Sequence, residues 1–415
     1  MRDIEAFQES AKIDATLRGI KGEVLSDRKD HVVRPARLIP IVIAMMTAVV
    51  LLTGGGCGKG LYPVVSSSSA TATSTTSATS NFLYATNNTD GILSAFARNV
   101  STGVLTFIAQ YTAGADSGPM GLAITPDNDF LYVVNSADNQ VYEYEIGSTG
   151  ALLALTNISG GTAPQMIAID NTGSFAYVTN ATTRSVSEYV IASNGELSLS
   201  GTITGFPGKP FGVITSGSFL YVTDETAGLI YAFAINSDGT LTILTSSPIS
   251  SNGSVGGEPG LMAVIVQSGQ DYLMVDDLAT GEVAVFLINS DGSLTFNANF
   301  GTGQSNPVGI GAVTTSINSY VFTANMTGGF VQPYTLAAGI LTQQNAASDP
   351  NTPTGLAIDP AGLFVYTGNS GTGTIAQLAI NGSSCGGAVL CLVKTYEAEH
   401  PTNATAGTEF IAITH

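Results

Sequence analysis

Few side chains in this sequence are suited to acid–base chemistry. Hydrolysis needs a base that activates water and a donor that stabilises the developing oxyanion. Glu258 and Asp276 are candidate bases, and Lys209 is a candidate donor. These residues are far apart in the chain, so the fold must bring their loops together. Other polar residues that could bind a ligand beside them are Arg184, Asp224, Asp277, Asn306 and His400.

A hexapeptide that recurs seven times sets the expected architecture. Its copies read FLYATN, FLYVVN, FAYVTN, FLYVTD, DYLMVD, YVFTAN and FVYTGN, spaced by 48, 45, 44, 52, 49 and 44 residues. A period in the forties that carries four strands is typical of β-propeller blades. The sequence therefore predicts an all-β, seven-bladed propeller over residues 81–415. The third positions of the hexads are Tyr84, Tyr132, Tyr177, Tyr221, Leu273, Phe322 and Tyr366.

Six prolines indicate where innermost strands begin, which leaves the first blade without one. Turns such as SNGELSL and SDGTLTI predict tight hairpins, because Gly there supplies a positive φ. The C-terminal segment 409–414 (EFIAIT) matches the inner-strand pattern GLAIT. We expect this segment to complete the first blade and close the ring. The six prolines are Pro119, Pro164, Pro210, Pro259, Pro307 and Pro353.

The propeller geometry predicts one face for the candidate residues. Lys209, Glu258 and Asn306 directly precede opening prolines, and His400 precedes Pro401. The other candidates follow second strands, where Asn or Asp recurs in every blade. Such a recurrent residue favours a turn cap over a catalytic role. An acidic subset that includes Glu225 could bind Ca²⁺, but its spacing matches no calcium loop, so we expect neither metal nor cofactor.

Charge divides the chain at Cys57. Eight of the 13 Lys and Arg residues precede it, whereas 24 of the 31 acidic residues follow it. The part after Cys57 therefore carries a net charge of −19, which opposes nucleic acid as a partner. We expect a monomer with an acidic, solvated surface.

The first 57 residues are interpreted as a signal segment. A 16-residue apolar run from Leu38 to Thr53 is shorter than a bilayer-spanning helix and ends in small residues before Cys57. The Gly-Cys junction resembles a bacterial lipobox, which would make Cys57 the lipidated N-terminus; an uncleaved signal anchor is the alternative. Residues 58–80, rich in Ser, Thr and Ala, are expected to be a flexible linker. This layout predicts a membrane-anchored protein of the bacterial cell envelope, periplasmic or on the cell surface.

Two further cysteines fit an oxidising compartment. Cys385 and Cys391 lie in a loop-like stretch (SSCGGAVLC). Their spacing favours a local disulfide, with two free thiols as the alternative.

The motifs FAYVTN, Pro-x-Gly and TG-x-L resemble those of two groups of propellers. These are the YVTN-repeat propellers and the lactonase family, whose members are similar to 6-phosphogluconolactonase. The resemblance covers residues 81–415. It implies a propeller and lactone hydrolysis. Members of the lactonase family share a Pro-Arg-His segment at the start of an inner strand, whereas no opening proline here is followed by Arg or His.

Two functions remain open from the sequence. The first is a binding or scaffold module that recognises an envelope protein or a glycan through its loop-rich face. The second is a hydrolase that opens a sugar-type or other small lactone, with Glu258 or Asp276 as base and Lys209 as donor.

Overall fold

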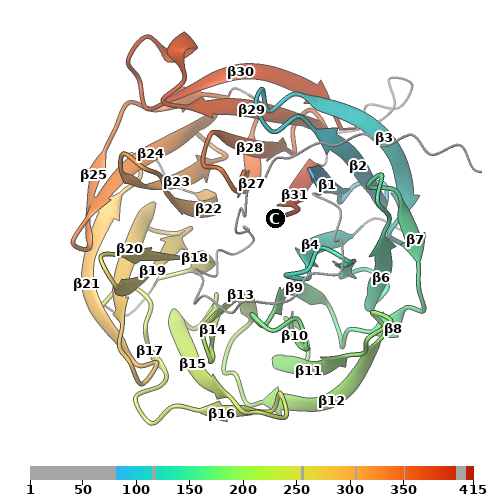
Figure 1. Ribbon diagram of the computed structural model, residues 1–415. Helices are drawn as coiled ribbons and strands as arrows, with labels where there is room; N and C mark the ends of the chain where they lie inside the picture. The colour runs from blue at the N-terminus through green and yellow to red at the C-terminus, as the bar shows by residue number, and fades with distance from the viewer. Residues whose placement is uncertain (1–80, 115–117, 254–256, 304–305, 350, 399–407) are drawn as a thin grey trace, which may run out of the picture. The chain divides into compact units, whose positions relative to one another are not determined.

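The computed structural model shows a ring of seven antiparallel sheets (Figure 1). It describes residues 81–114, 118–253, 257–303, 306–349, 351–398 and 408–415. Their one helix is the 3-10 turn η1 (Ser383–Cys385), so the predicted all-β propeller is confirmed. No helix in these ranges is long and apolar enough to cross a membrane. The expected signal, Cys57 and linker lie outside the described residues.

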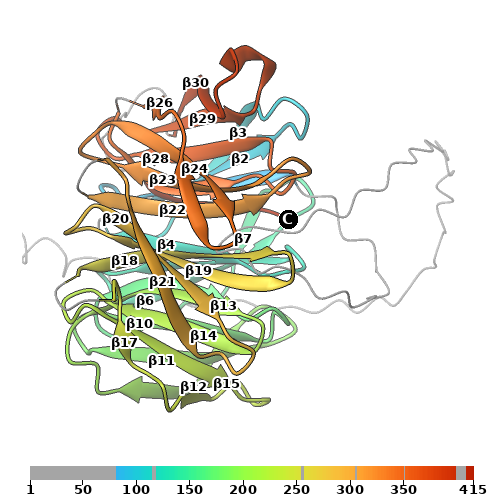
Figure 2. The ribbon, with the colours of Figure 1, turned by 90° about the vertical axis from the view of Figure 1, so that its left-hand side faces the viewer.

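Innermost strands line the centre of the ring, and in six blades they begin at the predicted prolines. In the side view (Figure 2), inner strand β22 runs roughly along the axis of the ring. The inner strands of blades 2 to 7 are β4 (Pro119–Ile124), β9 (Pro164–Ile169), β13 (Pro210–Ser216), β18 (Pro259–Gln267), β22 (Pro307–Thr314) and β27 (Pro353–Ile358).

Second strands carry the hexapeptides and are almost wholly buried, because they pack between neighbouring blades. Each ends in Asn or Asp. They are β1 (Phe82–Asn87), β5 (Phe130–Asn135), β10 (Phe175–Asn180), β14 (Phe219–Asp224), β19 (Gln270–Asp277), β23 (Ser319–Asn325) and β28 (Phe364–Asn369).

Third strands continue each sheet outwards. They are β2 (Ile92–Arg98), β6 (Gln140–Ile146), β11 (Ser185–Ile191), β15 (Leu229–Ile235), β20 (Glu282–Ile288), β24 (Phe330–Ala337) and β29 (Thr374–Ile380).

Outer strands consist mostly of exposed and half-buried residues. In blades 2, 4 and 6 they are split into two pieces that pair with the same third strand. A disulfide joins Cys385 of η1 to Cys391 of β30, as expected from the sequence. The outer strands are β3 (Leu105–Thr112), β7 (Leu152–Ala154) with β8 (Ile158–Ser159), β12 (Leu197–Thr204), β16 (Leu241–Ile243) with β17 (Ile249–Ser250), β21 (Leu294–Gly301), β25 (Ile340–Gln343) with β26 (Ala347–Ser348), and β30 (Leu390–Glu397).

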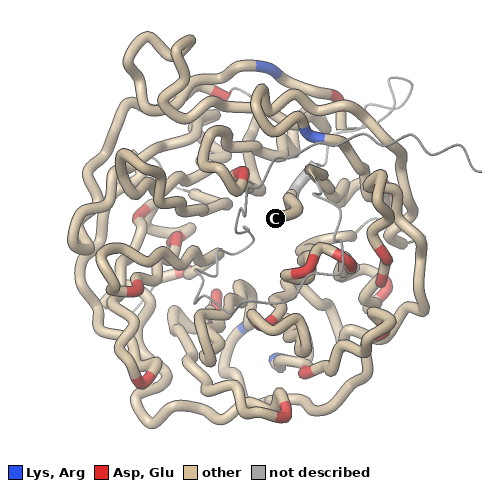
Figure 3. The backbone as a smooth tube through the Cα atoms, viewed as in Figure 1, with Lys and Arg blue, Asp and Glu red and all other residues tan. Residues whose placement is uncertain are grey.

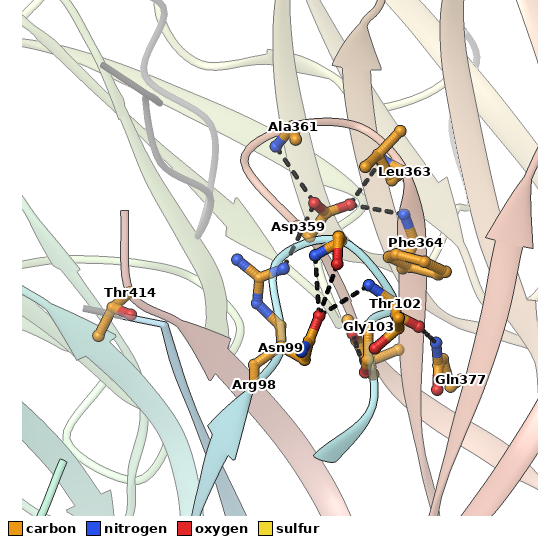
Figure 4. A network of polar contacts seen from close by, with 12 residues as sticks. Arg98, Asn99, Thr102, Gly103, Asp359, Ala361, Leu363, Phe364, Gln377 and Thr414 are labelled. Carbon is orange, nitrogen blue, oxygen red and sulfur yellow. Dashed lines mark hydrogen bonds and ion pairs between the residues drawn. The ribbon is translucent and has the colours of Figure 1, made fainter. Parts of the chain in front are cut away.

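The C-terminal strand closes the ring, as predicted. Strand β31 (Thr408–Ile413) pairs antiparallel with β1, so blade 1 combines the two ends of the domain. Beyond it, the amide of Phe82 donates to Oγ1 of Thr414 at 2.8 Å. Next to this seam, Arg98 of blade 1 forms a buried ion pair with Asp359 of blade 7, at 3.5 Å (Figure 4).

One hexad of the sequence alignment is wrong by one residue. In blade 4, Pro210 lies opposite Asp224 and Val213 opposite Val222. In blade 5 the corresponding residue pairs between β18 and β19 place Asp277, rather than Asp276, at the end of the hexapeptide. The hexad is therefore YLMVDD, with Met274 rather than Leu273 in the third position. Two adjacent acidic residues made both frames possible in the sequence.

Neighbouring blades are joined by what we call the interblade tyrosine bond. The third-position tyrosine of a hexad donates its hydroxyl to the carbonyl of the glycine in the next blade's outer hairpin. The acceptor is buried at the blade interface, so the bond satisfies a carbonyl that water does not reach. The five bonds are Tyr84 to Gly150 (3.0 Å), Tyr132 to Gly195 (2.7 Å), Tyr177 to Gly239 (2.9 Å), Tyr221 to Gly292 (2.9 Å) and Tyr366 to Gly103 (2.6 Å).

Candidate functional site

The loops that were predicted to form a site do gather on one face of the ring. Each opening proline lies opposite the Asn or Asp that ends the second strand, as in the pairs Pro210–Asp224 and Pro259–Asp277. This register places the loops before inner strands beside the turns after second strands. The histidine of the described residues, His415, lies beyond the other end of β31, where its backbone bonds Asn128.

Asp224 and Asp277 have structural roles in these turns. Both are fully buried or nearly so. Asp224 accepts from the amides of Gly208 and Ala227, and Asp277 accepts from the amides of Glu258, Ala279 and Thr280. These contacts fix the loop before the inner strand to the turn after the second strand. They confirm the interpretation of the recurrent Asn or Asp as a turn cap at these two positions.

Basic side chains are scarce in the described ring, as the few blue segments in Figure 3 show. Arg98 is buried against Asp359, and the Lys394 ammonium group lies 4.5 Å from the ring centre of Tyr396. The other two in the described ranges are Arg184 and Lys209, and both line one pocket. The fold thus brings together two of the predicted residues that are 25 positions apart in the chain.

This pocket, which we call the blade 3–4 pocket, has a volume of about 460 Å³. Lys209 and Arg184 are exposed at its wall. Arg184 donates to the carbonyl of Pro207 at 2.9 Å, and the Lys209 backbone is held by Thr226 and Glu225. The pocket is lined by Gln165, Ala181, Thr182, Arg184, Lys209, Pro210, Phe211 and Glu225.

Glu225 is the acid of this pocket. The sequence singled it out only as a member of an acidic subset that could bind Ca²⁺, not as a catalytic or ligand-binding residue. It is half-buried at the turn after β14. Burial raises its pKa, the charges of Glu258 and Asp224 raise it further, and the Lys209 ammonium opposes the rise. The signal in the sequence was its place directly after the capping Asp224, opposite the loop that carries Lys209. A carboxylate of raised pKa is a better base than an exposed glutamate.

Glu258 and Asn306 lie outside the residues that line this pocket. Glu258 is exposed before β18 and acts on Glu225 only through its charge. The amide of Asn306 donates to the carbonyl of Leu278 at 3.2 Å, and its φ of 69° marks a left-handed turn position. His400 lies outside the described residues.

Asp276 occupies a different place, a cavity of about 170 Å³ at the inner strands. Its side chain is fully buried. Burial raises its pKa well above the usual value, and the charge of Asp277 adds to this rise. The backbone amides of Leu261 and Gly260 oppose the rise, although neither completes a hydrogen bond to the carboxyl. The predicted trio of Lys209, Glu258 and Asp276 therefore does not converge on one pocket.

The positions of the family's Pro-Arg-His segment do contribute to the blade 3–4 pocket. Gln165 and Phe211, which line it, directly follow the opening prolines of blades 3 and 4. Within the described ranges no group of His, Cys, Asp and Glu is arranged to hold a metal ion. The side chains that line the pocket offer charge and hydrogen bonds.

Solved structures with the same fold include sugar-lactonase-like proteins. A putative 6-phosphogluconolactonase from Bacteroides fragilis has a TM-score of 0.68 and 19% identity, over 83% of this chain and 100% of that one. The periplasmic gluconolactonase of Pseudomonas aeruginosa has a TM-score of 0.67 and 18% identity, over 81% of this chain and 99% of that one. These identities are low enough that the likeness shows the fold alone.

The sequence itself identifies the family. It has no match among curated proteins. The family model described as "Lactonase, 7-bladed beta-propeller" matches residues 62–163 and 139–306, which together make up more than half of the chain. The protein therefore belongs to the lactonase family of seven-bladed β-propellers.

Proposed function

We propose that this protein binds a small lactone in the blade 3–4 pocket and hydrolyses it. The observation that carries the proposal is the convergence of Arg184, Lys209 and Glu225 on one pocket of a lactonase-family propeller. The cavity that contains Asp276 and the small one beside Gly121 and Met166, by contrast, have no Lys or Arg in their lining. A lactone becomes a carboxylate when it opens, so two cations suit its product as well as its transition state.

In the proposed reaction, Glu225 accepts a proton from water, and the water oxygen attacks the lactone carbonyl carbon. Lys209 stabilises the resulting oxyanion. The ring C–O bond then breaks, and the proton held by Glu225 passes to the leaving alkoxide, which gives a hydroxy acid. Arg184 would hold the ligand, since its guanidinium can donate to several oxygen atoms. Gln165 offers a neutral amide for hydroxyl groups of a sugar-type substrate.

The proposed mechanism predicts the direction of the pH dependence. Glu225 must be ionised to act as base, and burial raises its pKa. Activity should therefore rise with pH through that raised pKa, and the rise should vanish in Glu225→Gln.

A pH-stat assay of the full chain against a lactone panel that includes gluconolactone tests the proposal. Lys209→Ala should reduce kcat/KM by about 10²–10³-fold, and Glu225→Gln by about 10²–10⁴-fold. Lys394→Ala removes a lysine that lies over Tyr396 and should leave activity unchanged. Equal turnover in Lys209→Ala and the parent protein would contradict the proposed role of the pocket.

Binding without turnover is the second candidate function. It is favoured by the residues after the opening prolines, none of which is the Arg-His pair of the family segment. A binding module at the envelope would use the same pocket for a glycan or a protein side chain. Inactivity across the lactone panel, together with saturable binding of gluconate that Arg184→Ala weakens, would favour this function.

We also propose that the protein works in the cell envelope. The periplasmic location in the name of the Pseudomonas aeruginosa neighbour supports this, as does the signal-like sequence before Cys57. Fractionation and mass spectrometry of the mature N-terminus test both the location and the lipid on Cys57. A monomeric state, expected from the sequence, can be measured by analytical ultracentrifugation.

A further inference from the structure

Asp276 replaces a threonine that recurs at one position of the ring. In blades 1, 3 and 4 the residue before the capping Asn or Asp is Thr86, Thr179 or Thr223. Each hydroxyl donates to the carbonyl of the residue that follows the next blade's opening proline, at 3.3, 2.6 and 2.8 Å. In blade 5 a carboxyl group stands in that place. An ionised carboxylate cannot donate, so the bond that the threonines make is lost unless something supplies a proton.

Among the described residues the carboxyl group of Asp276 has no ion-pair partner, and the backbone amides of Leu261 and Gly260 compensate its charge only in part. Its side chain is fully buried, and neither of its oxygens has a hydrogen-bond partner among the described residues. The ion pair found in those ranges is Arg98–Asp359, on the blade 7–1 side of the ring. Burial of an unpaired charge is strongly unfavourable, so an acid at this position points to a ligand that pairs with it.

The cavity beside Asp276 is otherwise mostly apolar. Its volume of about 170 Å³ is close to that of an engineered cavity of about 150 Å³ that binds benzene. A molecule of roughly six to nine non-hydrogen atoms therefore fits. Asp276 is the charged side chain of its lining, and the polar ones are Thr354 and Ser370. The apolar lining comes from Met120, Phe211, Leu261, Leu278, Val308, Met326 and Phe410.

We propose that this cavity binds a small organic ammonium ion whose apolar body packs against the Met and Phe side chains and whose nitrogen donates to Asp276. The charge-assisted bond supplies the donors that the two carboxylate oxygens lack. Aromatic rings such as Phe211 and Phe410 attract cations, and thioethers such as Met120 and Met326 adapt to irregular apolar shapes. The net charge of −19 after Cys57 draws cations to the domain. This site goes beyond the proposed lactone pocket, which is lined by the basic residues Arg184 and Lys209.

Benzylamine and benzyl alcohol form a matched pair of probes, because they differ in charge but hardly in size. Isothermal titration of the full chain at about 150 mM salt, where surface attraction is screened, should show benzylamine binding at least tenfold more tightly than benzyl alcohol. Equal affinity for the two probes, or no binding of benzylamine up to its solubility, would overturn the proposal.

Substitutions of Asp276 complete the test. Asp276→Asn keeps the shape of the side chain, and Asp276→Thr restores the residue found in blades 1, 3 and 4, so at least one should fold. Each should weaken benzylamine binding at least tenfold, whereas Asp291→Asn, an equal charge change in an exposed hairpin, should not. Unchanged benzylamine affinity in a folded Asp276→Thr protein would show that the acid is not the ligand's partner. Lactone turnover can persist or fail independently of this result.

Discussion

The interface between blades 4 and 5 and the interface between blades 5 and 6 satisfy the same backbone group in different ways. At the first, the Tyr221 hydroxyl donates to the carbonyl of Gly292 at 2.9 Å. At the second, the hexad residue is Met274, and Nδ2 of Asn297 in outer strand β21 donates to the carbonyl of Gly339 at 2.7 Å. At both interfaces the buried hairpin carbonyl has a side-chain donor. The tyrosine is one of the two donors that these interfaces use.

The interface between blades 5 and 6 has two further hydrogen bonds of its own. Gln267 donates to the carbonyl of Leu336 at 2.6 Å and accepts from the amide of Ala338 at 2.7 Å. Both bonds reach the same hairpin as Asn297. Blade 5 thus replaces one buried hydroxyl by two amide side chains nearer the surface, and it is the blade that carries Asp276.

Opening the ring is expected to have the largest effect, because every interface depends on closure. Deletion of residues 408–415 removes β31, with buried Phe410, Ile411 and Ile413, and exposes the edge of β1. At roughly 2 kcal/mol for each large side chain, the loss approaches the whole free energy of unfolding of a typical domain. Urea unfolding should lose its cooperative transition. Deletion of His415 alone keeps β31 and is the control. A cooperative unfolding transition as large as that of the parent protein in both deletion variants would contradict closure of the ring by this strand.

A methyl group at a hairpin glycine should have the next largest effect. Gly239 has a φ of 82°, and a Cβ there would overlap the ring of Phe175 in blade 3. Strain at positive φ and overpacking together give a destabilisation of about 4 kcal/mol for Gly239→Ala. Gly217, with a φ of 58° and open space around its Cβ position, isolates the backbone strain. If Gly217→Ala and Gly239→Ala lower the free energy of unfolding in urea by the same amount, the contact of the added Cβ with Phe175 contributes nothing to the destabilisation.

Much of this interface pattern follows from local sequence rules. Prolines such as Pro210, Gly-centred turns and alternating strands fix the blades, and the EFIAIT segment indicates the closing strand. The frame of blade 5 was missed because Asp276 and Asp277 are adjacent and only the pairing of Pro259 distinguishes them. Local patterns do not contain that long-range information.

The candidate site was partly predictable for the same reason. The sequence placed Lys209 and Arg184 on one face, and the structure brings them to one pocket, because loop position along a blade determines the face. It did not show that Glu225 rather than Glu258 shares their pocket, since the direction of a side chain in a turn depends on the cap beneath it. The separation of Asp276 from Lys209 is likewise a property of the assembled ring.

Glu143 provides a pH-dependent test of the interfaces that use tyrosine. It lies opposite Tyr132, as Glu188 lies opposite Tyr177, whereas Val285 occupies this position opposite Met274 in blade 5. Burial raises the pKa of Glu143 from 4.5 to about 7. The folded state therefore favours the protonated acid: its contribution to stability is complete below about pH 4.5 and is lost as the pH rises to about 7.

Glu143→Gln should remove this loss. The amide oxygen can still accept from the amide of Leu197, and blade 7 already has Gln377 at this position. Relative to the parent protein, the variant should gain up to about 3 kcal/mol between pH 5 and pH 8 in urea unfolding. Parallel pH profiles for the two proteins would mean that Glu143 titrates normally.

The smallest expected effect compares the two donors directly. Tyr221→Phe removes only the hydroxyl that reaches Gly292, and Asn297→Ala removes only the amide that reaches Gly339. Tyr221→Phe should cost about 1–2 kcal/mol, because the buried carbonyl loses its donor without access to water. Asn297 is nearer the surface, where water can replace its amide, so Asn297→Ala should cost less than about 1 kcal/mol. Urea unfolding of both variants, with Asn289→Ala in an exposed turn as control, measures the difference. If Asn297→Ala lowers the free energy of unfolding more than Tyr221→Phe does, the stability of the ring depends more on the blade 5–6 interface, although its bonds lie nearer the surface.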